Sequence, residues 1–138
     1  MKNKEAIAGV LFSRPCFYSF QEESTGLYWL IPISSKVEKY KAIYKKIVEK
    51  HDKCDTIFFS EVMRKQRAFL IQNMCPTTEE YIADEYINPV SNSPVRIDIF
   101  DEQELIYKAR SVLYYVHNGN KKLIFPDVLK IEKKLLGR

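Results

Sequence analysis

The segment from Tyr28 to Lys41 constrains the fold more than any other part of the chain. It opens with an apolar run, Tyr28–Ile33, which is rich in aromatic and β-branched residues and predicts a β-strand. Ser34 and Ser35 end that run, and a lysine-rich pattern with helical spacing follows them directly. We therefore expect a buried strand that passes almost at once into a helix, with both hydroxyls where the helix begins.

This junction has the composition of an anion-binding site. Unpaired N–H groups and the positive end of the helix dipole meet at a helix N-terminus, and Lys36 and Lys39 add full positive charge there. Serine is also a preferred N-cap residue, and lysine-rich helix faces are usually just solvated. From the residues alone, the junction is either an ordinary capped helix start or a phosphate site, for which an RNA backbone is one natural ligand.

Size and composition indicate one folded domain, residues 1–138. The hydrophobic content of 46% with 13% aromatic residues excludes a disordered protein. No apolar run approaches the roughly 20 residues that span a bilayer, so no membrane partner is expected. The short apolar patch Ala6–Phe12 reaches Arg14 without a small-residue cleavage site, and we therefore expect a cytoplasmic protein.

The charge favours an anionic partner, and the ligand-forming residues do not favour a metal. The formal net charge is +4 and the sequence pI is about 8.9, with the lysines unevenly distributed. The three cysteines form neither a CxxC pair nor a Cys/His group: Cys16, Cys54 and Cys75. The carboxylates form no close group of the kind that a two-metal nuclease needs, and the four glycines form no nucleotide-binding loop. We expect no metal and no cofactor.

The remaining pattern predicts strands first and helices mainly later. Apolar runs rich in aromatic and β-branched residues predict strands at 15–20, 27–33, 55–62, 67–74 and 95–97. Helical spacing predicts helices at 36–51, 77–83, 101–117 and from 125 onward. Asp101 is the expected cap of the third of these helices, and Arg64-Lys65-Gln66 is the expected turn between the third and fourth strands. This order favours an α+β fold with an antiparallel, barrel-like sheet.

Several other residues are candidates for contact with RNA. Arg64, Lys65 and Arg67 could clamp it, although hairpin tips are commonly charged for solubility alone. Gln72 and Asn73 could read base edges or could satisfy backbone groups in a turn. Three aromatic residues could stack on unpaired bases or pack in the core: Tyr18, Tyr28 and Trp29. Lys41 and Lys45 add positive charge along the expected helix. The two histidines are both expected at helix ends, where they complement the dipole: His51 and His117.

Three blocks of the sequence resemble the toxins of type III toxin-antitoxin systems, the ToxN, AbiQ and CptN group, with CptN-like members the most similar. The blocks are residues 14–18 (RPCFY), 28–40 (YWLIPISSKVEKY) and 67–74 (RAFLIQNM). The second block is the most specific, because it is similar to the family's Pro-x-[Ser/Thr]-Ser-(x)-Lys stretch. The resemblance implies a metal-independent endoribonuclease on a MazF- or Kid-like β-barrel with added helices.

The resemblance also implies partners and residue roles. Its partners would be target cellular RNA and a small RNA antitoxin of repeated, pseudoknot-like units, which the toxin processes and which inhibits it in a closed protein–RNA assembly. Phage defence is the role of many relatives. Ser34 and Ser35 match the family's active-site hydroxyl pair, Lys36 or Lys39 its lysine, and Arg14 a basic position on a neighbouring strand. One residue separates hydroxyls from lysine in ToxN-like sequences, so either lysine here could take that position.

RNA cleavage without a metal requires a base for the 2′-hydroxyl, a proton for the leaving 5′-oxygen and cations for the charge that develops on the phosphate. We expect the two serines to hydrogen-bond the scissile phosphate, the lysine to stabilise the transition state and Arg14 to assist. The products would carry 2′,3′-cyclic phosphate and 5′-hydroxyl ends. The alternatives are a basic RNA-binding module without catalysis and a protein-interaction domain that uses the C-terminal helices.

Overall fold

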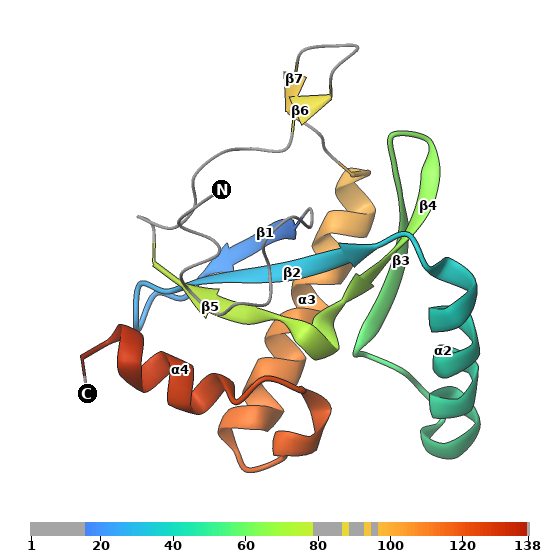
Figure 1. Ribbon diagram of the computed structural model, residues 1–138. Coiled ribbons are helices and arrows are strands. Elements are labelled where there is room, and N and C mark those ends of the chain that lie inside the picture. The colour runs from blue at the N-terminus through green and yellow to red at the C-terminus, as the bar shows by residue number, and fades with distance from the viewer. Residues whose placement is uncertain (1–15, 79–86, 89–92, 95–96, 138) are drawn as a thin grey trace.

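The computed structural model describes residues 16–78, 87–88, 93–94 and 97–137, which form an α+β fold (Figure 1). Within these residues, an antiparallel sheet curls into a half-barrel and is accompanied by three α-helices. The fold class and the antiparallel sheet expected from the sequence are thereby confirmed. No helix of the described residues is both long enough and apolar enough to cross a membrane.

Strand β2 is the centre of the main sheet. The sheet has the order β1-β2-β4-β3, and β5 also pairs with β2. The strands of this sheet are β1 (Cys16–Gln21), β2 (Tyr28–Ser34), β3 (Ile57–Val62), β4 (Lys65–Leu70) and β5 (Cys75–Thr77). A separate two-stranded pair consists of β6 (Ile87–Asn88) and β7 (Ser93–Pro94). Strand β2 pairs with β1 on one side and with both β4 and β5 on the other, and its final residue, Ser34, pairs with Ala68 of β4.

A short 3-10 helix, η1 (Ile71–Asn73), replaces the end of the strand expected at 67–74. Ser34 pairs with Ala68 and Leu30 pairs with Cys75, so three more residues lie on the β4–β5 side than on the β2 side. Those extra residues cannot remain in the ladder, and η1 accommodates them. The expectation of a continuous strand through Met74 is therefore wrong.

The β3–β4 hairpin turns one step earlier than expected. Met63 and Arg64 have φ values of 51° and 68°, as both central residues of a type I′ turn must. Lys65 and Gln66 already belong to β4, where they pair with Val62 and Glu61. The turn is therefore not Arg64-Lys65-Gln66, because the register of the ladder leaves two residues for it.

Helix α2 (Val37–His51) stands at the β3–β4 end of the sheet, apart from the other helices (Figure 1). Its apolar positions are only half-buried, and the helix contains no buried residue. The ring of Tyr44 contacts Phe59 edge-on, with 5.6 Å between centroids. Phe58 and its cross-strand partner Phe69 point to the other face of the sheet, so α2 packs on the face opposite the main core.

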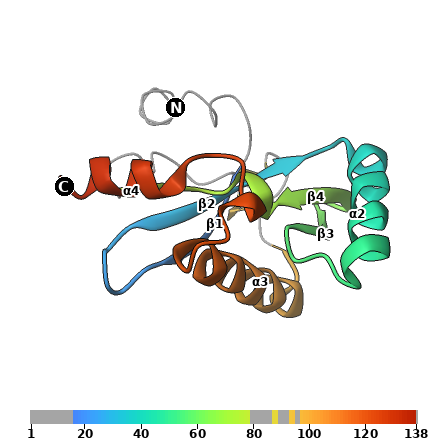
Figure 2. The same cartoon turned by 90° about the horizontal axis from the view of Figure 1, so that it is seen from below.

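The main core lies between the sheet and α3 (Ile99–His117), with α4 (Val128–Leu135) beside β5 (Figure 2). Trp29 is completely buried, which confirms core packing for this aromatic residue. The buried side of α3 carries Leu105, Ala109, Val112, Leu113 and Val116. Full burial of each such large apolar side chain contributes about 1.5–3 kcal/mol.

Helix α3 starts earlier than expected, at Ile99, and Asp98 is its cap. One carboxylate oxygen of Asp98 accepts the N–H groups of Phe100 and Asp101 at 3.0 and 3.2 Å. A capping side chain must reach the N–H groups two and three residues ahead of it, and Asp101 is already inside the helix. Asp127 caps α4 by accepting the N–H of Lys130 at 3.3 Å.

Two other predicted elements fall largely outside the described residues. The helix expected at 77–83 begins at Thr77, which instead belongs to β5, and the residues from 79 onward in that prediction are not described. The strand expected at 95–97 has only Ile97 within the described part of the chain. Among the catalytic candidates, Arg14 also lies outside the described residues.

Candidate functional site

The two serines at the β2–α2 junction have different environments. Ser34, the last residue of β2, is 7% exposed, and its Oγ accepts the N–H of Lys36 at 3.1 Å. Ser35 is exposed, and its carbonyl accepts the N–H of Val37 at 2.9 Å. Ser34 therefore holds the turn through a local hydroxyl-to-backbone hydrogen bond, whereas the hydroxyl of Ser35 is on the surface.

In the described part of the chain, no side chain caps the N-terminus of α2. Lys36 occupies the N-cap position, and it makes no side-chain hydrogen bond to the first turn. Within the described residues, the N–H groups of Glu38 and Lys39 have no hydrogen-bond partner. The interpretation of the serines as an ordinary helix cap is therefore wrong. The two N–H groups and the helix dipole together present partial positive charge at the junction.

Two lysines add full charge at this end of α2. Lys36 is exposed and forms no ion pair among the described residues. The ammonium of Lys39 lies over the ring of Tyr40, 5.3 Å from its centroid. Glu38, the acidic residue of the first turn, is directed to Lys41 at 4.0 Å instead of capping the helix. The junction therefore keeps two cations close to the unpaired N–H groups.

Strand β4 places the backbone of Arg67 next to the junction. Because Ser34 pairs with Ala68 in an antiparallel register, Arg67 comes level with Ser35 on the neighbouring strand. Arg67 is half-buried, and its Nη1 donates to the carbonyl of Gln66 at 3.0 Å. Arg64 and Lys65 are exposed at the hairpin tip, two or three residues beyond Arg67, or about 7–10 Å along the strand.

The other sequence candidates lie away from the junction or carry a different role. Gln72 is 7% exposed, and its backbone binds Thr56 and Phe125 at 2.9 and 2.8 Å, so it presents little amide to an external ligand. Asn73 is half-buried beside it in η1. Tyr28 is half-buried at the opposite end of β2 from Ser34, about 20 Å away along the strand.

The remaining candidates are on or near α2 or lack a described side chain. Lys41 and Lys45 are exposed on α2. His51 ends that helix, about 20 Å from its start, which agrees with a position at a helix C-terminus. Tyr18 pairs with Leu30 through the backbone of β1, and its side chain lies outside the described residues.

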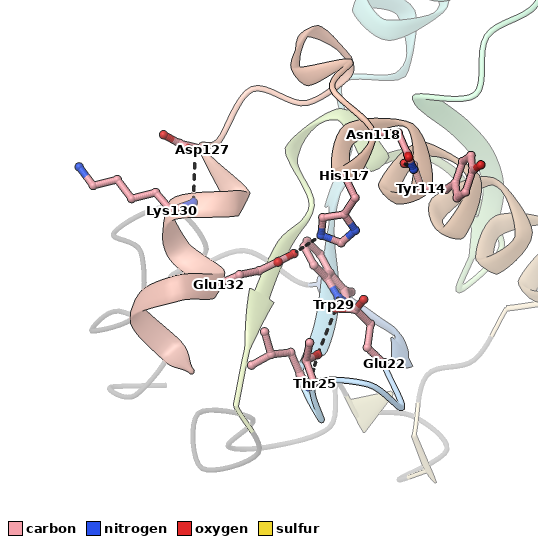
Figure 3. Close-up of polar contacts among 10 residues, drawn as sticks. Glu22, Thr25, Trp29, Tyr114, His117, Asn118, Asp127, Lys130 and Glu132 are labelled. Atoms are coloured by element: carbon pink, nitrogen blue, oxygen red, sulfur yellow. Dashed lines mark hydrogen bonds and ion pairs between the residues drawn. The ribbon is translucent and has the colours of Figure 1, made fainter. Parts of the chain in front are cut away.

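A second group of polar contacts, which sequence reasoning missed, involves residues of β2, α3 and α4 away from the β2–α2 junction (Figure 3). Glu22 Oε1 accepts the indole N–H of Trp29 at 2.8 Å and the hydroxyl of Thr25 at 3.2 Å. His117 Nε2 lies 2.8 Å from Glu132 Oε1, which ties the end of α3 to α4. Partial burial raises the pKa of Glu132 and outweighs the His117 hydrogen bond, which lowers it.

A third polar cluster surrounds Asp55. Lys108 on α3 donates to its carboxylate at 3.2 Å, and Lys53 lies 3.3 Å away. Burial alone would raise the pKa of Asp55, but the hydrogen bonds from Lys108 and Lys53 outweigh it and hold that pKa below its usual value. The hydrogen bond between Lys53 and Asp55 in turn raises the pKa of Lys53. Lys53 therefore belongs to a structural ion pair, away from the start of α2.

One buried pair connects α3 with the sheet near the junction. The hydroxyl of Ser60, which is 5% exposed, donates to Asp101 Oδ2 at 2.7 Å. Ser60 pairs across the ladder with Arg67, so both side chains point to the same face of the sheet. No local signal predicts this pair, because 41 residues separate its members.

Within the described residues, no group of three or more His, Cys, Asp or Glu side chains could hold a metal ion. The thiols of Cys54 and Cys75 are buried, and they form no disulfide among the described residues. No protein-family model matches the chain, and no curated protein sequence matches it. The function is therefore inferred from the residues of the β2–α2 junction.

Proposed function

We propose that the chain is a metal-independent endoribonuclease whose active site is the β2–α2 junction. One observation carries the proposal: the exposed hydroxyl of Ser35 lies beside an uncapped helix N-terminus with Lys36 and Lys39. Backbone N–H groups at a helix start and flanking cations are what a phosphate group requires. Arg67, level with Ser35 on β4, adds a guanidinium that can bind phosphate in a fork.

In the proposed reaction, the ribose 2′-oxygen attacks the adjacent phosphorus and displaces the 5′-oxygen. The 2′-hydroxyl loses its proton, the 5′-oxygen gains one, and the products carry 2′,3′-cyclic phosphate and 5′-hydroxyl ends. The hydroxyl of Ser35, the N–H groups of Glu38 and Lys39, and the ammonium of Lys36 or Lys39 stabilise the charge on the phosphate. Ser34 is a positioning residue, since its Oγ holds the backbone of Lys36.

The biological role proposed here rests on the resemblance of three sequence blocks to type III toxins. The curled antiparallel sheet would then be a MazF- or Kid-like barrel, and the chain a cytoplasmic toxin inhibited by its own repeated RNA antitoxin in a closed assembly. The exposed basic residues of α2 and the β3–β4 hairpin would extend the RNA contact from the junction: Lys41, Lys45, Arg64 and Lys65.

The test compares wild-type protein with single serine variants on a mixed RNA in EDTA, with the ends of the products identified. Ser35→Ala should lower the cleavage rate about 10²–10³-fold, as the loss of one preorganised donor does. Ser24→Ala, at an exposed turn position between β1 and β2, is the matched control and should cut like wild type. Equal cleavage by Ser35→Ala and wild type, or products with 3′-hydroxyl and 5′-phosphate ends, would refute the mechanism.

A non-catalytic RNA-binding module is the second candidate, and the position of the histidines favours it. Both histidines lie away from the junction, His51 at the opposite end of α2 and His117 at the end of α3. The junction thus has cations and a hydroxyl but no imidazole for proton transfer. In this case RNA would bind at low salt, Lys36→Ala would weaken binding, and no variant, wild type included, would cut.

A further inference from the structure

Three aromatic side chains form a line along the outer side of α3. We call Phe100, Tyr107 and Tyr114 the aromatic ridge; they are 75%, 73% and 64% exposed. Successive members are seven residues apart, so the three fall within about 40° of one another around the helix. The line extends over about 21 Å.

The ridge is directly opposite the side of α3 that contributes to the core. At about 100° per residue, the buried residues centre on the direction opposite Tyr107. In Figure 2, α3 forms one margin of the molecule, and no other described helix or strand lies on its outer side. The line of a surface helix farthest from the core is normally charged or polar. Single exposed aromatic residues are common, but three that are aligned on one side of a helix indicate a contact surface.

The charges along α3 indicate what binds the ridge. Acidic residues are confined to its first half and basic residues to its second. Asp101, Lys108 and His117 are paired within the molecule. The exposed charges nearest the ridge are Glu104 and Arg110, three residues before and three residues after Tyr107. The acidic half would repel a nucleic acid. A second α3 in parallel orientation would place like charges together, whereas an antiparallel α3 would place acidic against basic residues. The surface is thus complementary to itself in one orientation.

We propose that two copies of this chain associate through their aromatic ridges, with the α3 helices antiparallel and the twofold axis at Tyr107. Tyr107 then contacts its counterpart. Phe100 and Tyr114 are each seven residues from Tyr107, so Phe100 of each copy meets Tyr114 of the other.

The area of the ridge predicts a weak dimer. An aromatic side chain buries about 150–250 Å², so the three exposed rings bury about 300–500 Å² per copy. The total of about 600–1,000 Å² from both copies reaches the lower limit of stable interfaces only when flanking side chains are added. We therefore expect concentration-dependent association with a Kd on the order of 10 µM or weaker.

Sedimentation velocity on the full chain from about 1 µM to about 500 µM tests the proposal. The average mass of wild type should rise from the monomer toward the dimer. Tyr107→Glu places two negative charges against each other at the axis and should weaken dimerisation at least about tenfold. Phe125→Glu changes another aromatic residue that is 71% exposed and not on α3, and it should dimerise like wild type. A monomer at every concentration, or equal weakening by both variants, would overturn the proposal.

Oxidative cross-linking of single cysteine variants, with Cys16 replaced by serine, tests the orientation. The two remaining native cysteines are buried. Tyr107→Cys should cross-link to itself, and Phe100→Cys should cross-link to Tyr114→Cys when the two variants are mixed. In the proposed pair, two copies of residue 100 are about 20 Å apart, so Phe100→Cys alone should not cross-link. Cross-linking of Phe100→Cys to itself would indicate parallel helices and overturn the arrangement. If the protein is a monomer and Tyr107→Ala binds single-stranded RNA more weakly than wild type, the ridge is instead a surface for base stacking.

Discussion

Replacing Asp98 with alanine removes both hydrogen bonds that cap α3. The carboxylate accepts the N–H groups of Phe100 and Asp101 at 3.0 and 3.2 Å, and it is the one side-chain cap of α3 among the described residues. Loss of a capping side chain costs about 1 kcal/mol, within a range of about 0.5–2 kcal/mol. For a domain of this length, the Tm should fall by about 3–5 °C per kcal/mol. Thermal unfolding followed by circular dichroism measures the change, and Asp98→Ser should restore most of the stability because serine also caps helices.

Asp101 is the control, because it is the cap that the sequence alone suggested. Asp101→Ala should also destabilise the protein, by about 1–3 kcal/mol, but for another reason: it leaves the buried hydroxyl of Ser60 without its acceptor. In a Ser60→Ala background most of that cost should disappear, whereas the cost of Asp98→Ala should be unchanged. If Asp98→Ala leaves the Tm unchanged and Asp101→Ala costs the same in both backgrounds, then Asp101 is the cap and the reasoning fails.

Three further changes should alter stability in directions set by the structure. Burial raises the folded pKa of Glu132 above the unfolded value of about 4.3. The protonated side chain therefore contributes stability below the unfolded pKa, and this contribution is lost as pH rises through the folded pKa. Glu132→Gln should therefore raise the Tm at pH 7 and not at pH 4, as measured by calorimetry. Asp55 has the opposite sign, because its folded pKa is lowered: Asp55→Asn should reduce stability at pH 7 in urea titrations, and the difference should shrink as pH falls through that pKa. Glycine adopts a φ of 68° without strain, so Arg64→Gly should raise the free energy of unfolding by about 1 kcal/mol at most. The urea midpoint should rise accordingly.

Sequence reasoning located elements whose signals are local. The apolar run before Ser34 and the helical spacing after Lys36 predicted β2 and α2 almost to the residue. The error at 67–74 arose because its residues read as a continued strand. Only the pairing of Cys75 with Leu30, a contact between distant segments, requires η1. The cap of α3 was misplaced for a related reason: Asp98 and Asp101 are the same residue type, and only backbone geometry distinguishes them.

The candidate site divides in the same way. Its core, from Ser34 to Lys39, is contiguous in sequence and could be proposed from the pattern. The different roles of the two serines could not, because they depend on which side of the last strand residue is covered. The contribution of Arg67 depends on the register between β2 and β4. The pair formed by His117 and Glu132 depends on how α4 returns to the end of α3.

The absence of any buried residue in α2 makes it the least firmly attached of the described helices. We expect its amide protons to exchange with solvent through local opening well before those of α3, whose inner side is fully covered. A phosphate that binds at its first turn would bind only the closed form and would slow that opening in proportion to its occupancy. Deuterium uptake along α2, with and without RNA, would therefore report ligand binding and helix order at the same positions. Under the proposed function, RNA bound at the junction would therefore increase the order of α2.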